Sequence, residues 1–171
     1  EEDLTKAGGR VVRGKVGHVN MKAALADQGC VFGGELSGHF YFRENYNADS
    51  GAIAMSVILS ILGQSGKHLS ELIKPIARYA QSGEINFTIE DKDGAMAAIK
   101  KEYGPGSSFA GKVDELDGVT VDCWAKHGWW ANIRKSNTEP LLRLNAEAKD
   151  KATLDAAVGM LTPRLGHRVD H

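Results

Sequence analysis

The first 62 residues alternate between strand patterns and helix patterns, and this order constrains the fold of the chain more than any other feature. GGRVVRGKV (8–16) has the pattern of a short strand, and NMKAALADQG (20–29) has that of a helix. CVFGGE (30–35) then has the pattern of a buried strand, and residues 46–63 that of an almost wholly apolar helix. This order predicts a partial α/β unit, with helices on a mixed or parallel sheet.

Residues with local conformational preferences mark the ends of these helices. Asn20 is expected to cap the first helix and Gly29 to end it, and the apolar helix is expected to end at Gly63. A second amphipathic segment, residues 67–83, is ended or kinked by Pro75.

A new pattern begins at SGEINFTIED (82–91), where Ile85, Phe87 and Ile89 alternate with polar neighbours. We therefore expect two domains, residues 1–80 and 81–171. The second domain is predicted to be a small α+β domain, with an antiparallel sheet packed by helices. Its remaining expected elements are a helix at 93–104, a hairpin of 118–125 with 129–134, a strand at 140–148 and a helix at 150–166.

Composition and charge exclude several classes of function. The formal net charge is -1 with no basic block, so nothing indicates a nucleic-acid partner. The longest mostly apolar run, GAIAMSVILSILG, is shorter than the roughly 20 residues of a membrane span, which predicts a cytoplasmic protein without a membrane partner. Cys30 and Cys123 lie far apart in apolar contexts, which is typical of buried free thiols. No Cys or His spacing predicts a metal site.

The stretch GGELSGHFYF (33–42) is the first candidate site. In an extended segment Glu35, Ser37 and His39 would point to the same side and form one polar row. A carboxylate beside a hydroxyl suits the paired hydroxyls of a sugar ring. The alternative is a solvated edge strand, but three glycines are costly in a strand that serves no purpose, which favours a site.

The second candidate is RKSNTEP (134–140), which lies between two expected strands. Arg134 offers a guanidinium fork, and Ser136, Asn137 and Thr138 add hydroxyl and amide groups. This set fits a phosphate monoester, because an arginine makes paired, charge-assisted hydrogen bonds to phosphate. The alternative is a plain polar turn ended by Pro140. A hydroxyl-binding row and a phosphate-binding turn in one chain predict a single ligand, a phosphosugar.

The third candidate is His18, in KVGHVNMK between an expected strand and helix. Loops at the carboxyl ends of strands are where α/β domains bind ligands. A single loop histidine can equally be a structural, hydrogen-bonded residue.

These three stretches, in this order, resemble the α-D-phosphohexomutase family, most closely its bacterial phosphomannomutase/phosphoglucomutase branch. GELSGH is similar to the sugar-binding loop of that family and RKSNTEP to its phosphate-binding loop. KVGH, NADSG and DELDGV agree as well, so the resemblance covers nearly the whole chain. Leu36 stands where glucosamine-specific relatives usually carry Gln, which favours mannose or glucose phosphates.

The resemblance implies a four-domain enzyme in which a phosphoserine in the first domain exchanges the phosphoryl group and an aspartate-rich loop in the second holds Mg²⁺. The third domain reads the sugar hydroxyls, and the fourth grips the phosphate that does not react. This sequence matches the third domain, clipped at its N-terminal end, and the fourth. The residues carried over are the catalytic candidates His18 and His39, the sugar-binding Glu35 and Ser37, and the phosphate-binding Arg134, Ser136, Asn137 and Thr138.

The resemblance therefore implies an intramolecular phosphotransferase, an isomerase of carbohydrate metabolism. It would interconvert hexose 1-phosphate and hexose 6-phosphate through a bisphosphorylated intermediate, with hexose 1,6-bisphosphate as activator and Mg²⁺ bound by a domain absent from this chain. Its partners would be the phosphosugar and the missing N-terminal domains, and the segment by itself is expected to be inactive. The alternatives are a non-catalytic phosphosugar-binding or regulatory module, and an α+β interaction domain whose loops bind nothing.

Overall fold

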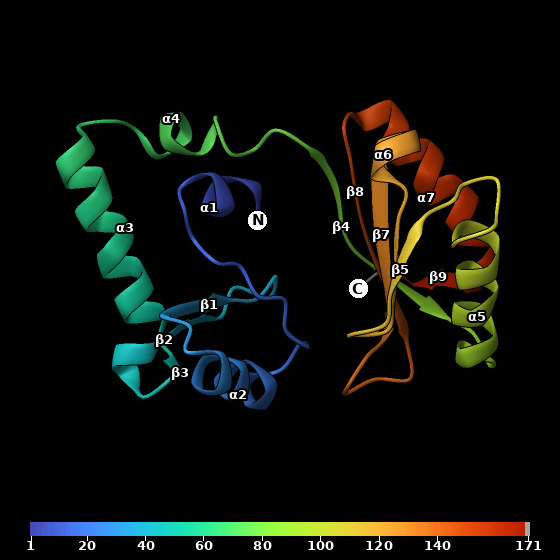
Figure 1. The fold of residues 1–171 in the computed structure, drawn as a ribbon, viewed down its shortest axis with the longest axis horizontal. Coiled ribbons are helices and arrows are strands. Elements are labelled where there is room, and N and C mark those ends of the chain that lie inside the picture. Colours follow the sequence, from blue (N-terminus) through green and yellow to red (C-terminus); the bar gives the residue numbers. More distant parts are fainter. Residues whose placement is uncertain (170–171) are drawn as a thin grey trace. The chain divides into compact units, whose positions relative to one another are not determined.

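The computed structural model describes residues 1–169 and divides into two compact units, Glu1–Ala77 and Arg78–His171. Figure 1 shows the helices and strands of both units along the chain.

The first unit joins helices to a small sheet. Its elements are α1 (Glu2–Lys6), α2 (His18–Gln28), β1 (Phe32–Gly34), β2 (Phe40–Phe42), the 3-10 turn η1 (Arg43–Asn45), β3 (Ala48–Asp49), α3 (Gly51–Ser65) and α4 (Leu69–Ile73).

The sheet of the first unit is antiparallel, so the expected mixed or parallel sheet was wrong. Its order is β1-β2-β3, with Phe32 opposite Phe42 and Tyr41 opposite Asp49. The reason is the connection: a short turn joins β1 to β2, whereas a parallel pair needs a long crossover. The expected strand at residues 8–16 is also not formed, because no described strand of this unit pairs with that segment.

Helix α2 packs directly on the hairpin of β1 and β2. Its Leu25 is buried, and a Cβ added at Gly33 would lie 2.8 Å from Leu25 Cδ1 and 2.9 Å from Met21 Cε. Glycine is therefore required at Gly33 for this close approach. The helix ends as expected at Gly29, which is left-handed, but it begins after Gly17, and Asn20 lies inside it.

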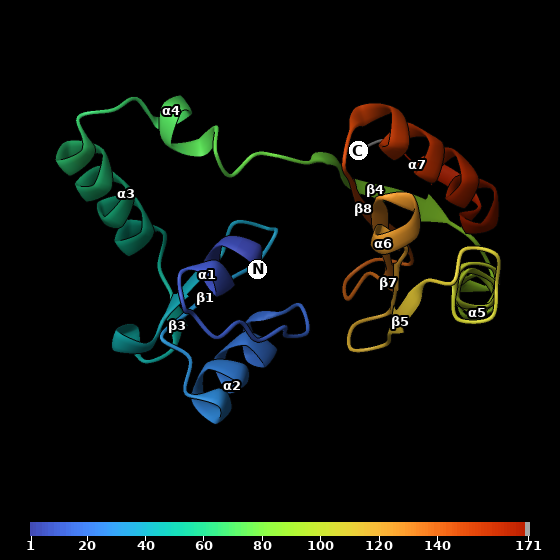
Figure 2. The same cartoon turned by 45° about the horizontal axis from the view of Figure 1, so that its top comes forward.

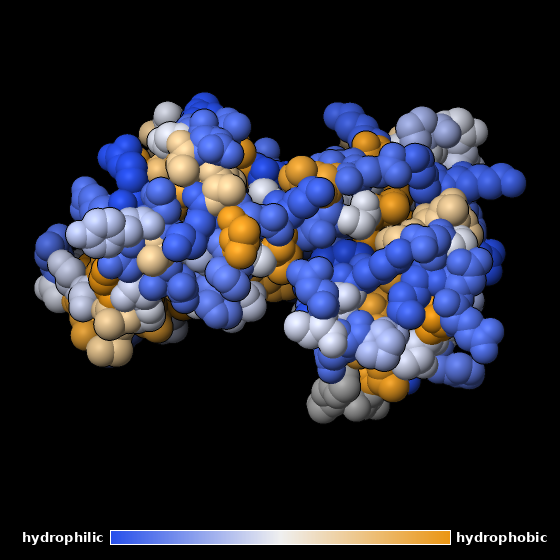
Figure 3. All heavy atoms as spheres, turned by 90° about the horizontal axis from the view of Figure 1, so that it is seen from below, coloured by the Kyte–Doolittle hydropathy of each residue, from blue (hydrophilic) through white to orange (hydrophobic). Residues whose placement is uncertain are grey.

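Helix α3 is formed as expected, but it begins after Ser50 and not at residue 46. Ser50 is its cap, because its Oγ accepts a hydrogen bond of 3.2 Å from Ile53 N. It continues past Gly63 to Ser65, because the left-handed residue that ends it is Gly66. Most of its apolar side chains are exposed, including Met55 and Leu59. Figure 3, coloured by hydropathy, shows apolar side chains reaching the surface in several places among hydrophilic ones.

The second unit is built on a six-stranded sheet. Among the described residues this sheet is antiparallel throughout and has the strand order β5-β6-β7-β8-β4-β9. Its elements are β4 (Ala80–Thr88), α5 (Lys92–Tyr103), β5 (Lys112–Asp114), β6 (Val119–Asp122), α6 (Trp124–His127), β7 (Trp129–Lys135), β8 (Leu142–Ala148), α7 (Lys151–Leu165) and β9 (His167–Val169). The expected antiparallel α+β architecture is confirmed, and the short strands β5 and β9 were not predicted.

Helices α5 and α7 cover one face of this sheet, as Figures 1 and 2 show. The burial of side chains alternates along strand β8. Leu142 and Leu144 are fully buried in the core under the helices, whereas Arg143 and Asn145 between them are only partly buried. Because successive side chains of a strand point to opposite faces, Arg143 lies on the face away from the helices. This uncovered face carries the polar groups of the second candidate site.

Candidate functional site

The segment from Glu35 to His39 is a tight turn between β1 and β2. Glu35 N donates to His39 O at 2.9 Å, and Gly38 N donates to Glu35 O at 3.0 Å. Gly38 has a φ of +85°, which glycine adopts without strain. The expected extended row of alternate side chains was therefore wrong, because the chain reverses direction within this stretch.

The turn nevertheless brings the three predicted side chains together. Ser37 Oγ lies 2.9 Å from His39 Nδ1, and His39 Nδ1 lies 3.9 Å from Glu35 Oε2. The side chains of Ser37 and His39 are exposed, so both can reach a ligand in solution. The Glu35 side chain is only 6% exposed.

The Glu35 carboxylate is held from two sides. Tyr41 Oη donates to its Oε2 at 2.6 Å, and Gly17 N donates to its Oε1 at 2.7 Å. Burial raises the pKa of Glu35, but these two hydrogen bonds and the neighbouring His39 and His18 outweigh it, so the pKa lies below its ordinary value. Glu35 is therefore ionised at neutral pH.

Sequence reasoning missed the role of Tyr41, which is fully buried. Burial together with the Glu35 carboxylate raises the pKa of Tyr41, so it remains a phenol donor. The sequence signal that could have revealed the role of Tyr41 is its position two residues after His39, at the end of the polar run. His18 is the first residue of α2, next to Gly17, and interacts electrostatically with Glu35. The structure thus brings His18, Glu35, Ser37 and His39 to one corner of the first unit.

The second candidate site is the loop between β7 and β8. Ser136 N donates to Leu141 O at 2.9 Å and closes the loop. Ser136 Oγ accepts from Glu139 N at 3.2 Å and from Thr138 N at 3.4 Å, which orders the turn. Asn137 and Thr138 are exposed at its tip.

Arg134 precedes this loop at the end of β7 and is 8% exposed. Its Nη2 lies 3.3 Å from Glu84 Oε2, and its Nη1 lies 3.5 Å from Lys135 O. Arg143 of β8 completes the group, with Nη2 2.7 Å from Glu139 Oε2. Sequence reasoning named Arg134 but missed Glu84 and Arg143, although the alternation of β8 places Arg143 on the uncovered face.

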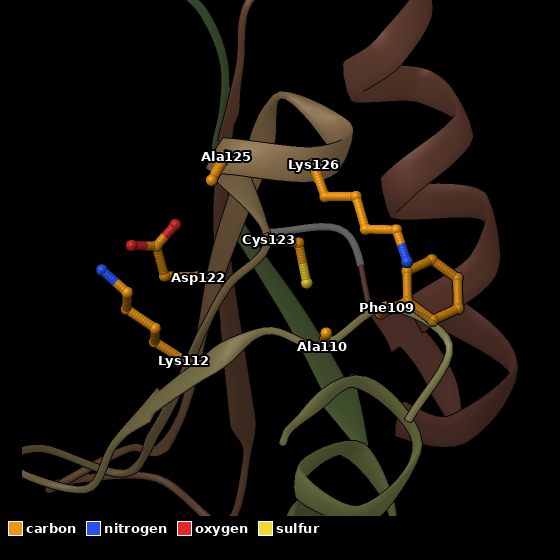
Figure 4. Close-up of a pocket in the computed structure, with 7 residues that line it drawn as sticks. All are labelled: Phe109, Ala110, Lys112, Asp122, Cys123, Ala125 and Lys126. Carbon is orange, nitrogen blue, oxygen red and sulfur yellow. The ribbon is translucent and has the colours of Figure 1, made fainter. Parts of the chain in front are cut away.

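A separate small cavity in the second unit does not form a ligand site. It has a volume of about 70 Å³, well below the roughly 300–1,000 Å³ of small-molecule pockets. Figure 4 shows the Cys123 thiol among its lining residues. Burial raises the pKa of Cys123 to about 11, so the thiol stays protonated at neutral pH and is a poor nucleophile.

Among residues 1–169, no group of three or more His, Cys, Asp or Glu side chains is arranged to hold a metal ion. No helix there combines the length and the apolar character that crossing a membrane requires.

Comparison with known proteins agrees with this division of the chain. The family described as "Phosphoglucomutase/phosphomannomutase, alpha/beta/alpha domain III" matches residues 1–79. The family described as "Phosphoglucomutase/phosphomannomutase, C-terminal domain" matches residues 84–162. The second candidate site, the loop after Arg134 together with Glu84 and Arg143, thus falls within the C-terminal domain match.

Similar proteins of known name point the same way. A phosphomannomutase of Methanocaldococcus jannaschii is 40% identical over 157 residues, which are 92% of this chain and 33% of the relative. A protein of Xanthomonas campestris named "Phosphohexose mutases" is 40% identical over 154 residues, which are 90% of this chain and 33% of the relative. The crystal structure of a phosphoglucomutase/phosphomannomutase family protein from Burkholderia thailandensis aligns with a TM-score of 0.71 at 26% identity, covering 94% of this chain and 34% of that one. The chain therefore spans about a third of the length of these relatives.

Proposed function

The chain belongs to the phosphoglucomutase/phosphomannomutase family, of which it carries domain III and the C-terminal domain, and on this premise we propose that it is the phosphosugar-binding part of a phosphohexomutase. The full-length enzyme would interconvert hexose 1-phosphate and hexose 6-phosphate, with mannose or glucose as the sugar. The first unit would read the sugar hydroxyls, and the second would grip the phosphate that does not react. We propose a cytoplasmic location for this protein, and its two free cysteines support that proposal.

The observation that carries this proposal is the loop after Arg134. A buried guanidinium stands beside an ordered turn whose tip presents the amide of Asn137 and the hydroxyl of Thr138. A phosphate ester needs a positive charge and several donors arranged around one point. Arg134, Ser136, Asn137 and Thr138 supply that combination.

The first unit supplies complementary groups for a sugar. An ionised carboxylate has about four lone-pair positions, and the hydrogen bonds from Gly17 and Tyr41 use two of them. Glu35 therefore keeps lone pairs for sugar hydroxyls, which would reach it through the 6% of its side chain that is exposed, while Ser37 can donate or accept beside it. Because Tyr41 and Gly17 hold the carboxylate in place, little conformational entropy is lost when the sugar binds.

His18 and His39 are proposed to lie near the reacting end of the sugar, where an imidazole can hold or move a proton. Phosphoryl transfer is helped mainly by positioning and by stabilising the charge of the transferred group. Family membership implies that the full-length enzyme depends on Mg²⁺, which neutralises that charge when bound. The described residues provide no cluster that fits the ion, so we assign it no ligand in this chain, and we expect the chain by itself not to turn over substrate.

An NMR titration of the chain with mannose 1-phosphate tests the proposal. Backbone amides of 35–39 and 134–138 should both shift, with a dissociation constant of the order of 1 mM, about -4 kcal/mol. Inorganic phosphate should shift only the 134–138 amides. Glu35→Gln should remove the shifts of the hairpin, whereas Glu44→Gln, an exposed carboxylate of the same unit, should not.

The outcomes separate the alternatives. If a folded chain shows no shift at either segment, the proposed function is wrong for these residues. If binding is seen but addition of the N-terminal domains of a family enzyme restores no mutase activity despite stable association, a non-catalytic phosphosugar-binding module is the better description.

A further inference from the structure

Helix α2 begins without a capping side chain of its own. Its N-cap residue is Gly17, which has no side chain to accept a hydrogen bond from the first turn, and that turn contains no acidic residue. In a capping box, a Glu or Gln three residues after the N-cap accepts from the N–H of the N-cap residue. Asn20 stands at that position, and its Nδ2 donates to Val16 O at 2.9 Å instead. The N–H of Gly17 therefore needs an acceptor from another part of the chain.

That acceptor is the carboxylate of Glu35, in the turn between β1 and β2. Its Oε1 accepts from Gly17 N at 2.7 Å, although the two residues are 18 apart in the chain. A negative charge at the N-terminal end of a helix is also favoured by the helix dipole. The carboxylate thus takes the place of the missing capping residue and fixes the point at which α2 begins. His18, the first residue of α2, is fixed with it.

The other oxygen of the same carboxylate is bound to the centre of the small sheet. Tyr41 Oη donates to Glu35 Oε2 at 2.6 Å. Tyr41 is fully buried in β2, the middle strand, where it lies between Gly33 of β1 and Asp49 of β3 in the register. Both hydrogen bonds have the short lengths of charge-assisted ones. The carboxylate is therefore held between a buried strand and the start of a helix.

This arrangement keeps His39 apart from the carboxylate. His39 Nδ1 lies 3.9 Å from Glu35 Oε2, which is beyond hydrogen-bond distance, and 2.9 Å from Ser37 Oγ. While Tyr41 occupies Oε2, the imidazole and the hydroxyl stay together at the exposed rim of the turn. If the phenol hydroxyl is removed, His39 is close enough to take over the hydrogen bond, which would draw it away from Ser37 and from a bound sugar.

We propose that Tyr41 is a positioning residue of the sugar site: its hydroxyl fixes the carboxylate of Glu35, which in turn fixes the start of α2 and with it His18. This inference rests on the proposed function, because it takes the corner of Glu35, Ser37 and His39 to be the sugar site. Tyr41 is fully buried and cannot reach a ligand, so it acts only through the carboxylate. One phenol hydroxyl thus links the turn that reads the sugar to the helix that carries His18.

The backbone amide of Gly17 reports on the carboxylate directly, because its N–H is bonded to Oε1. In the folded wild-type chain, the NMR chemical shift of this amide should change as the pH passes through the pKa of Glu35, which lies below 4.5. Burial raises this pKa and the hydrogen bond from Tyr41 lowers it, so Tyr41→Phe should move the midpoint upward. Glu35→Gln should abolish the response and so identify its source. The other titratable groups that face Glu35 or Tyr41 are His18, His39 and Asp49.

The second measurement is the affinity of the full chain for mannose 1-phosphate, by NMR titration at neutral pH. Tyr41→Phe should weaken binding by about threefold to tenfold and reduce the shifts of the 35–39 amides, because the carboxylate loses one of its two anchors. Inorganic phosphate, which is expected to contact only the 134–138 loop, should bind as it does to wild type. The matched control is Tyr46→Phe, which removes the same atom from a side chain that is 92% exposed and should match wild type in both measurements.

The outcomes separate this inference from the proposed function. If the wild-type Gly17 amide does not respond to pH below 4.5, or responds equally in Glu35→Gln, the inference is overturned even where Tyr41→Phe does not fold. If wild type binds the sugar phosphate but Tyr41→Phe leaves its affinity or the Gly17 midpoint unchanged, Tyr41 has only a structural role; the inference is then overturned and the proposed function stands. If wild type shows no shifts at 35–39 with mannose 1-phosphate, the proposed sugar site is wrong and the inference falls with it.

Discussion

Tyr41→Phe isolates the hydrogen bond that holds the sugar-site carboxylate. The substitution removes one oxygen and keeps the ring, so packing of the fully buried side chain is preserved. What is lost is the 2.6 Å hydrogen bond from Tyr41 Oη to Glu35 Oε2. The Glu35 side chain is 6% exposed, so water replaces the lost donor poorly.

The expected magnitude follows from that burial. A hydrogen bond to a charged group contributes about 1.5–3 kcal/mol. Because the carboxylate of Glu35 keeps its hydrogen bond from Gly17, we expect a loss of about 2 kcal/mol in the free energy of unfolding of the first unit. For a domain of this size that corresponds to a fall in Tm of roughly 8–16 °C.

The measurement must report on the first unit by itself. Tryptophan fluorescence is unsuitable, since Trp124, Trp129 and Trp130 all belong to the second unit. Urea unfolding followed through the backbone amides of β1 and β2 by NMR is specific to the first. The control is Tyr46→Phe, which removes the same atom from a side chain that is 92% exposed and should change stability by less than about 0.5 kcal/mol. Equal effects of the two substitutions would refute the reasoning.

Three further predictions concern charge, dynamics and packing. The pKa of Glu35 in the folded chain lies below its ordinary value of 4.5, so the contribution of Glu35 to stability is present above pH 4.5 and is lost as the pH falls through the lower folded value. Glu35→Gln should therefore flatten the acid limb of a plot of stability against pH for the first unit. An unchanged acid limb would contradict this. Amides in α3, whose only buried residue is Ala54, should exchange with solvent orders of magnitude faster than those of β7. Equal protection of the two elements in hydrogen-exchange measurements would contradict this. Trp129→Ala should cost about 3–5 kcal/mol in unfolding free energy because the side chain is 2% exposed, whereas Trp130→Ala on the half-buried face should cost distinctly less, as chemical denaturation would show.

The candidate sites illustrate how far sequence reasoning reaches. Glu35, Ser37 and His39 could be named as a group because polar residues between glycines at such a spacing are unusual, and the structure does bring them together. The geometry behind that grouping was wrong, since the segment is a turn and not an extended row. Their roles in binding stay predictions, as do those of His18 and the loop after Arg134.

Local chemistry explains the features that the sequence by itself determined. Gly29 ends α2 as expected, because the preference of glycine for a left-handed conformation depends only on a few neighbouring residues. The alternation of β8 and the position of the loop after Arg134 were readable for the same reason. Family resemblance could be identified because its motifs are continuous stretches of chain.

Tertiary structure decided the features that depend on partners distant in the chain. Whether residues 8–16 form a strand, and in which direction the first sheet runs, depends on which segments pair. The hydrogen bond of Glu35 to Gly17 joins residues 18 apart, and the ion pair of Arg134 with Glu84 joins residues 50 apart. Such contacts form only when folding has closed the intervening chain, so no local pattern encodes them. The sequence determined which chemical groups are available, and the tertiary structure decided which of them meet.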